Sequence, residues 1–309
     1  MYLFKVINKD KSFKKGWGEN LYSFALFLWV NNSTKIERYG VLMKINHSEV
    51  KVIACDIDGS LLPYGASAIS DEICELIDQL TEKGIHFLIA SGRGEESIRD
   101  LFAPVQNKIE YVCANGAIYI EKDELIFTQP FERSEINGIL NDFKKDTNLT
   151  PVIMCADQFY IILSGDEKEK KLKRELLREA VLENIIEVEG PEEIPQEICK
   201  LGVYQREIMN AKELSSYKHR WPHAIMVSGG GNWLDVTYRG TNKGSALKKI
   251  LHRKGMTPDN LMTFGDNEND TEMLQIAKYG FAVKNAVQVA KQAAAYECEN
   301  VASILRKLV

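Results

Sequence analysis

The sequence lacks the cysteine spacings of a zinc site or a disulfide framework. None of its six cysteines stands in a C-x-x-C pair, the spacing that is typical of zinc ribbons and thiol redox sites. Several lie inside apolar runs, where free cysteine behaves as a small hydrophobic side chain. This usage is typical of a reducing compartment and predicts a cytoplasmic location. The cysteines are Cys55, Cys74, Cys113, Cys155, Cys199 and Cys298.

An excess of positive charge is also absent. Lys and Arg total 39 and Asp and Glu total 44, which gives a formal net charge of −5. Proteins that bind nucleic acids usually have a clear basic excess, so we expect no nucleic-acid partner. The charge is uneven, because residues 1–42 carry seven basic and three acidic side chains, a net of +4, and the rest carries 32 and 41, a net of −9.

No apolar run near the N-terminus is long enough to cross a bilayer. The most apolar one, Leu21–Val30, has ten residues, whereas a membrane-spanning helix needs about 20. Three interpretations of residues 1–42 stay open: a signal peptide or anchor, an apolar helix or strand packed on the main body, or an upstream extension of a protein whose translation begins at Met43. We treat this segment as a leader and expect no stable membrane association.

The length of 309 residues allows one large domain or two ordinary ones. From residue 51 onward, short apolar runs such as 51–55 and 85–90 alternate with amphipathic stretches, one of which follows the candidate N-cap Ser70. The same alternation returns over residues 261–308. It predicts an α/β fold with a Rossmann-like, doubly wound parallel sheet covered by helices on both faces.

The middle of the chain has a different pattern. Amphipathic stretches near 134–145 and 168–183 are interrupted by strand-like segments. These segments are 159–163, 200–205 and 224–227. We therefore predict an inserted α+β domain over residues 131–233, which leaves 43–130 and 234–309 as the two parts of the core.

Carboxylates follow two of the predicted core strands. Residues 56–62 read D-I-D-G-S-L-L, and residues 264–270 read F-G-D-N-E-N-D. In open α/β sheets, ligands bind at the carboxyl ends of the strands, although Asp and Gly also favour simple turns. Like charges crowded at one edge repel each other by about 4 kcal/mol per close pair. A hard divalent cation with oxygen ligands relieves that repulsion, so the crowding predicts a Mg²⁺ site.

Two weaker motifs accompany the acidic ones. S-G-R at residues 91–93 follows a predicted strand, and T-N-K-G at residues 241–244 begins a predicted helix. A hydroxyl and a flexible backbone at a strand end can hold phosphate oxygens. Taken alone, the first is also a common turn and the second an ordinary surface lysine.

Together and in this order, the four motifs resemble those of the haloacid dehalogenase superfamily of phosphotransferases. The finer resemblance is to its Cof-type branch (subclass IIB), through I-A-C-D-I-D-G-S-L-L, A-S-G-R, A-N-G-A and G-D-N-E-N-D. It covers about residues 51–308. Ser60 stands where the family more often has threonine, and the hydroxyl is kept. The 149 residues between Arg93 and Lys243 leave room for the larger α/β cap (C2 type) found at that point in the superfamily.

The resemblance implies an aspartyl-phosphate mechanism. Asp56 would attack phosphorus, Asp58 would act as the general acid and base, and Lys243 would complete the catalytic set. Mg²⁺ would bind the Asp56 carboxylate, the backbone carbonyl of Asp58 and Asp266.

Further residues would bind phosphate or support the site. Besides Lys243, the phosphate-binding positions implied are Ile57, Ser91, Gly92 and Asn269. Asp270 would orient Lys243 or a metal-bound water, Arg93 would form a salt bridge in the core or reach the substrate or cap, and Asn115 lies at a turn that faces the active site in the family.

The expected function is a Mg²⁺-dependent phosphatase that acts on small phosphorylated metabolites, such as sugar phosphates. A phosphomutase resembling the cap-bearing phosphomannomutases would share the aspartyl-phosphate and return the phosphoryl group to its substrate. A non-catalytic metabolite-binding regulator is the third alternative.

Overall fold

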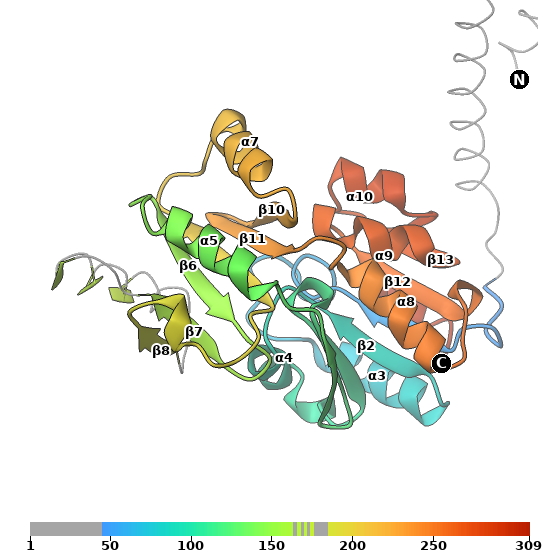
Figure 1. Cartoon of the computed structure of the whole chain (residues 1–309). Coiled ribbons are helices and arrows are strands. Elements are labelled where there is room, and N and C mark those ends of the chain that lie inside the picture. Colours follow the sequence, from blue (N-terminus) through green and yellow to red (C-terminus); the bar gives the residue numbers. More distant parts are fainter. Residues whose placement is uncertain (1–44, 163–165, 168–169, 172–173, 176–184) are drawn as a thin grey trace, which may run out of the picture. The chain divides into compact units, whose positions relative to one another are not determined.

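The computed structural model describes residues 45–162, 166–167, 170–171, 174–175 and 185–309 (Figure 1). The leader of residues 1–42 lies outside these residues, and so does most of the helix expected over 168–183. Within the described part of the chain, no helix is both long enough and apolar enough to cross a bilayer.

An eight-stranded sheet forms the core, in the order β14-β13-β12-β1-β2-β3-β4-β5. The six strands from β14 to β3 are parallel, and β4 and β5 add an antiparallel hairpin. This confirms the predicted Rossmann-like α/β core. The strands are β1 (Val52–Cys55), β2 (His86–Ala90), β3 (Ile109–Cys113), β4 (Ile118–Glu121), β5 (Glu124–Thr128), β12 (Leu261–Gly265), β13 (Tyr279–Val283) and β14 (Tyr296–Cys298).

Helices cover both faces of this sheet. On one face, Val52 and Ala54 of β1 pack against Leu247 and Ile250 of α8, with α9 beside it. On the other face, α3 packs against β2 and α11. The Ser70 hydroxyl caps α3 by accepting the Ile73 N–H at 3.4 Å. The helices are α3 (Asp71–Glu82), α4 (Glu95–Leu101), α8 (Lys243–Arg253), α9 (Thr271–Ile276), α10 (Gln288–Ala293) and α11 (Val301–Leu305).

A second, six-stranded sheet is inserted between β5 and α8, in the order β10-β11-β9-β6-β7-β8. Helix α5 (Arg133–Phe143) packs its apolar side chains on one face of this sheet, and α7 (Ala211–Arg220) lies beside β10 (Figure 1). This arrangement confirms the predicted α+β insertion. The strands are β6 (Leu149–Met154), β7 (Phe159–Ile162), β8 (Ile185–Val188), β9 (Lys200–Gln205), β10 (Ala224–Gly230) and β11 (Trp233–Tyr238).

Strand β11 begins at Trp233 and ends at Tyr238, so it crosses the boundary expected between residues 233 and 234. The domain limits therefore stay predictions. Because only four residues separate Tyr238 from Lys243, the last strand of the second sheet leads almost directly into α8.

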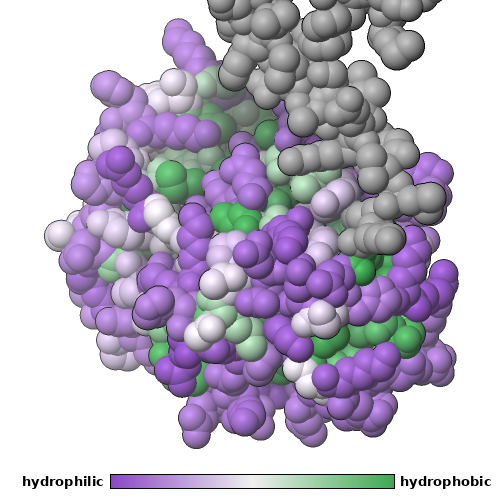
Figure 2. Space-filling view, turned by 90° about the vertical axis from the view of Figure 1, so that its right-hand side faces the viewer, coloured by the Kyte–Doolittle hydropathy of each residue, from purple (hydrophilic) through white to green (hydrophobic). Residues whose placement is uncertain are grey.

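On the face seen in Figure 2, exposed side chains are mostly hydrophilic and the apolar ones form small separate groups.

Candidate active site

The central feature of the candidate site is the carboxyl edge of the parallel sheet. Strand β1 pairs with β12 on one side and with β2 on the other. The strand order therefore runs outward from β1 in both directions, which makes β1 a topological switch point of the sheet. Asp56 follows β1, Ser91 follows β2 and Asp266 follows β12. These side chains gather at one edge because parallel strands end on the same side, and this edge is where such sheets bind ligands.

Lys243 joins two of the acidic motifs. Lys243 is the first residue of α8, and it is 0% exposed. The Nζ atom donates to Asp56 Oδ1 at 2.5 Å and to Asp270 Oδ1 at 2.7 Å. A buried charge of this kind is tolerated only when it is paired and hydrogen-bonded. The lysine is therefore built into the site and is not a surface residue.

Asp266 occupies the adjacent position. Its Oδ2 accepts a hydrogen bond from the Tyr64 hydroxyl at 2.8 Å, and its Oδ1 lies 3.3 Å from the Ser60 hydroxyl. Gly59 adopts φ +89°, and a Cβ there would lie 2.2 Å from Asp266 Oδ2. Only glycine therefore fits at this position, which explains the glycine of the D-I-D-G motif.

Burial and charge shift the pKa values at this site. The pKa of Asp56 is well above its usual value, chiefly through desolvation and further through Asp270 and Asp266, and Lys243 opposes the rise. Desolvation also raises the pKa of Asp266. Burial alone would lower the pKa of Lys243, but Asp270 and Asp56 outweigh it and raise the pKa above its ordinary value. The site thus contains three buried carboxyl groups, Asp56, Asp266 and Asp270, but only one buried positive side chain among them, Lys243.

This excess of negative charge fits a bound cation. Carboxylate oxygens of Asp56, Asp266 and Asp270 lie within 4.8 Å of one another. In Asp270, however, one oxygen accepts from Lys243, and the other accepts the N–H groups of Asp266 and Asn267 at 2.9 and 3.0 Å. Asp270 is thus held by a charged lysine and by two backbone N–H groups. Among the described residues, Asp266 accepts only from side-chain hydroxyls, which can rotate away, so Asp266 and Asp56 are better placed to supply ligands to a hard cation.

Asp58 lies outside this carboxylate group. Its two oxygens accept from Arg93 Nη2 at 2.7 Å and Nε at 2.9 Å, and its side chain is 48% exposed. Such a two-point pairing fixes the orientation of a carboxylate. Arg93 therefore forms a salt bridge within the core domain, and its other expected role, reaching the substrate or cap, stays a prediction. The Ile57 side chain is fully buried, so only its backbone is available to a ligand.

Four of the expected residues lie around the S-G-R turn. Ser91 is buried, and its backbone carbonyl accepts the Asn115 N–H at 2.9 Å. Asn115 Oδ1 accepts from Asn269 Nδ2 at 3.0 Å, which links the second motif to the fourth. The Gly92 carbonyl accepts from Lys200 Nζ at 2.8 Å. The structure therefore brings Ser91, Gly92, Asn115 and Asn269 into one hydrogen-bonded group.

Sequence reasoning missed three residues that contact these groups. Tyr64 gives no signal, since it follows the first motif in a loop. Lys200 and Asp235 are charged residues within otherwise apolar strands of the second sheet, and this placement could have identified them. Both are more than 90% buried, which is unusual for charged side chains unless they are paired.

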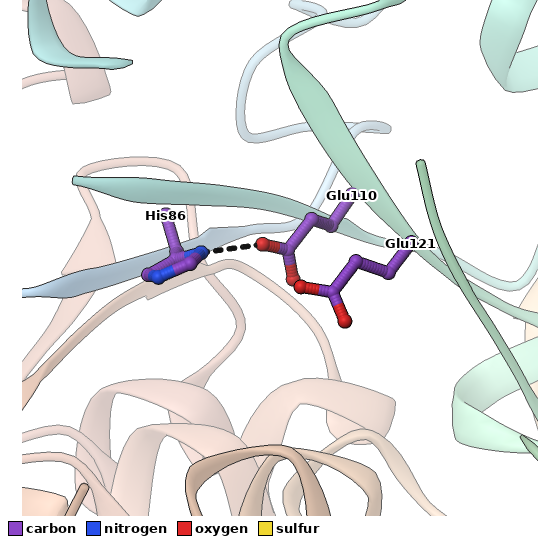
Figure 3. A group of neighbouring side chains, drawn as sticks. All are labelled: His86, Glu110 and Glu121. Carbon is purple, nitrogen blue, oxygen red and sulfur yellow. Dashed lines mark hydrogen bonds and ion pairs between the residues drawn. The ribbon is translucent and has the colours of Figure 1, made fainter. Parts of the chain in front are cut away.

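A second group of ionisable side chains lies at the opposite end of the parallel strands. It contains His86 at the start of β2 and Glu110 and Glu121 on neighbouring strands (Figure 3). Lys254 Nζ donates to Glu110 at 3.0 Å and to Glu121 at 2.5 Å. Burial would raise the pKa of Glu110, but hydrogen bonds from His86 and Tyr119 and the charge of Lys254 lower it. Because Lys254 lies between the two carboxylates and His86 and Tyr119 also bond Glu110, the group is a structural ion network.

Replacing Lys254 with methionine is expected to lower the free energy of unfolding by about 3 kcal/mol at pH 7, because it removes the buried cation that lies between two partly buried glutamates. The loss should shrink as the pH falls below the usual glutamate pKa of 4.5, where protonation removes the repulsion. Urea denaturation at pH 7 and at a pH below 4.5 measures the two losses. An equal loss at both would contradict the assignment, and Lys284→Met, at an exposed ion pair, is the control.

The described surface also has a cavity of about 600 Å³ next to α7, lined by residues of α7 and of the loops near Asn148 and Arg206. None of the expected site residues lines it.

Comparison with known proteins agrees with this geometry. A family model described as haloacid dehalogenase-like hydrolase matches residues 53–303. The 5-amino-6-(5-phospho-D-ribitylamino)uracil phosphatase YbjI of Escherichia coli is 25% identical over 256 residues, which cover 80% of this chain and 90% of that protein.

Solved structures have the same fold. One from Eubacterium rectale has a TM-score of 0.73 and 29% identity, covering 84% of this chain and 100% of that one. The subclass IIB sugar phosphatase BT4131 has a TM-score of 0.70 and 22% identity, with the same coverage.

Proposed function

This chain belongs to the haloacid dehalogenase-like hydrolases and is a phosphoric monoester hydrolase, and we propose that it hydrolyses small phosphorylated metabolites with Mg²⁺ through an aspartyl-phosphate. The observation that carries this proposal is the buried group in which Lys243 bridges Asp56 and Asp270 beside Asp266. It combines a carboxylate nucleophile, a fixed cation and excess negative charge at the ligand-binding edge of the sheet.

The proposed nucleophile is Asp56. Its Oδ1 is held by Lys243, which leaves Oδ2 to attack phosphorus in line with the departing oxygen. The attack forms the phosphorus–Oδ2 bond and breaks the bond to the leaving group, so one difficult displacement becomes two easier ones. Water then attacks the phosphorus of the aspartyl-phosphate and releases inorganic phosphate and free Asp56.

Asp58 is the proposed general acid and base. In the first step it gives a proton to the leaving oxygen, and in the second it takes a proton from the attacking water. The Arg93 guanidinium accounts for one lone pair on each Asp58 oxygen. Because each carboxylate oxygen has a second lone pair, Asp58 can carry the proton while Arg93 holds its orientation.

The remaining residues are proposed to bind the phosphoryl group. Ser91, the Gly92 N–H and Lys243 would contact its oxygens, since phosphoryl transfer depends on positioning and charge neutralisation. Asn269 uses one amide hydrogen on Asn115, and its second hydrogen is free to donate to phosphate.

The residues proposed to hold Mg²⁺ are the carboxylates of Asp56 and Asp266 and the backbone carbonyl of Asp58. When bound, the ion would offset the repulsion between these carboxylates and an anionic phosphate. The raised pKa values of Asp56 and Asp266 support this proposal, because a cation is what such a cluster lacks.

The substrate proposed is a small polyhydroxylated phosphate ester, a sugar phosphate or similar compound. Support comes from the names of the relatives, one a phosphatase for a phosphorylated ribityl compound and one a sugar phosphatase. We propose a cytoplasmic location, because the six cysteines are all free, which is typical of a reducing compartment.

The test is phosphate release from a panel of phosphorylated metabolites, with Mg²⁺ and with EDTA. We expect release with Mg²⁺, a loss of about 10³-fold with EDTA, and recovery when Mg²⁺ is added back in excess. Isomerised sugar phosphate without free phosphate would instead identify a phosphomutase. No turnover of any compound would favour a binding protein, and each of these two outcomes contradicts the proposal.

A further inference from the structure

Two buried charges of the second sheet, Lys200 and Asp235, reach the candidate site. Lys200 lies opposite Thr237 and Gly202 opposite Asp235 in the antiparallel pairing of β9 with β11. Opposite residues and residues two apart share a face, so Lys200 and Asp235 are diagonal neighbours on one face. The opposite face of the same strands is apolar and packs against α5. The charged pair therefore lies on the face that α5 leaves uncovered.

The pair is bonded to the first sheet's ligand-binding edge. Lys200 Nζ lies 2.7 Å from Asp235 Oδ1 and donates to the Gly92 carbonyl at 2.8 Å. Asp235 Oδ2 accepts from Asn115 Nδ2 at 2.7 Å. Asn115 in turn accepts from Asn269. One continuous chain of hydrogen bonds thus runs from Gly92 through the second sheet to Asn269.

The approach at Gly92 is close. A Cβ at this residue would lie 3.1 to 3.2 Å from Asn115 Oδ1, Asp235 Oδ2 and Lys200 Nζ. Asn115 has φ +55° and ψ +34°, the left-handed conformation that few residues other than glycine and asparagine adopt readily. Its side-chain bonds to Asp235 and Asn269 help to hold this conformation. The turn that carries the proposed phosphate-binding groups is thus fixed from the second sheet.

The polar atoms of the pair are directed at protein groups. Both oxygens of Asp235 accept hydrogen bonds, one from Lys200 and one from Asn115. The Lys200 ammonium in turn donates two hydrogen bonds, one to Asp235 and one to the Gly92 carbonyl. A pair that recognised the leaving group would present these atoms to the ligand. The geometry favours an indirect action, in which the pair orients the residues that contact phosphate.

From these contacts we infer that Lys200 and Asp235 are positioning residues that hold Gly92, Asn115 and Asn269 in their phosphate-binding arrangement. The inference rests on the proposed function, and it gives the inserted domain a part in binding the phosphoryl group itself, besides any part in choosing the leaving group. Loss of the Lys200–Asp235 pair should then weaken the binding of inorganic phosphate, and it should weaken the binding of every phosphorylated substrate by the same factor.

The experiment measures the dissociation constant of inorganic phosphate by calorimetry with Mg²⁺ present, and KM for two substrates with different leaving groups. Lys200→Met and Asp235→Asn should each weaken phosphate binding by about tenfold and raise both KM values by the same factor. Asp142→Asn is the matched control, since Asp142 pairs with Arg220 and Trp221 within the second domain and should leave phosphate affinity unchanged.

The double variant Lys200→Met with Asp235→Asn separates positioning from simple loss of stability. With no unpaired charge left, it should be more stable than the less stable single variant, and its phosphate affinity should stay about tenfold weak. Recovery of wild-type phosphate affinity in the double variant would overturn the inference. So would single variants that shift KM for one substrate only and leave the phosphate constant unchanged. Phosphate binding is measured without turnover, so this result is independent of whether the hydrolysis proposal holds.

Discussion

Replacing Asp56 with asparagine is expected to reduce phosphate release by about 10⁴-fold or more. The amide keeps the shape of the carboxylate but cannot form the acyl-phosphate, so the two-step route is lost. Binding of inorganic phosphate with Mg²⁺ should persist more than activity does, because Ser91, Lys243 and Asn269 remain. Steady-state phosphate release on the best substrate of the panel measures the effect.

The control for this variant is Asp123→Asn in the β4–β5 turn. Asp123 is exposed and has φ +63°, a conformation that asparagine tolerates well, so activity should be unchanged. Mg²⁺-dependent release by Asp56→Asn at more than about a hundredth of the wild-type rate would exclude Asp56 as the nucleophile.

Replacing Lys243 with methionine is expected to destabilise the protein and inactivate it together. The substitution leaves Asp56 and Asp270 buried without their counter-ion, which should cost about 3–5 kcal/mol of unfolding free energy without metal. The pKa of Asp56 should rise further, and a protonated carboxyl is a poor nucleophile. Urea denaturation and phosphate release measure the two effects.

Two further comparisons make this prediction specific. Mg²⁺ should restore part of the lost stability, since the cation supplies positive charge to the same carboxylates. Lys243→Arg should recover stability better than activity, because a guanidinium keeps the positive charge beside the two carboxylates but cannot reproduce the geometry of a compact ammonium. A Lys243→Met protein with wild-type stability and wild-type turnover would refute the assignment of this lysine.

The core of the fold could be predicted from sequence because its signals are local. Apolar β-branched runs gave β1 and β2 within about one residue, and Ser70 marked the start of α3. The acidic motifs follow these strands directly, so their convergence at one sheet edge followed from parallel pairing alone.

Strand β6 was missed for a physical reason. It contains Pro151, which cannot donate a ladder hydrogen bond and usually argues against a central strand. Here Pro151 pairs with β9 only, because the ladder with β7 begins at Val152. Pro151 thus lies beyond the end of the β7 ladder, a position that only the tertiary arrangement reveals.

The contacts between the two sheets were beyond sequence reasoning. The bond from Asn115 to Asp235 joins residues 120 positions apart, and the bond from Lys200 to Gly92 joins residues 108 apart. Neither residue of the Lys200–Asp235 pair lies in one of the four motifs. A salt bridge in the core was one of two roles expected for Arg93, but its partner Asp58 was not predicted.

The most direct test of the central claim is detection of the aspartyl-phosphate on Asp56. Wild-type protein is mixed with substrate and Mg²⁺, quenched in acid within one turnover, digested and analysed by mass spectrometry. Asp58→Asn, which should slow hydrolysis of the intermediate by about 10²–10⁴-fold, serves to accumulate it from an aryl phosphate, whose leaving group departs without protonation. We predict one phosphoryl group on Asp56, removed by hydroxylamine and absent from Asp56→Asn. A turning-over enzyme with no modified aspartate in either protein, or with the phosphoryl group on another residue, would contradict this account.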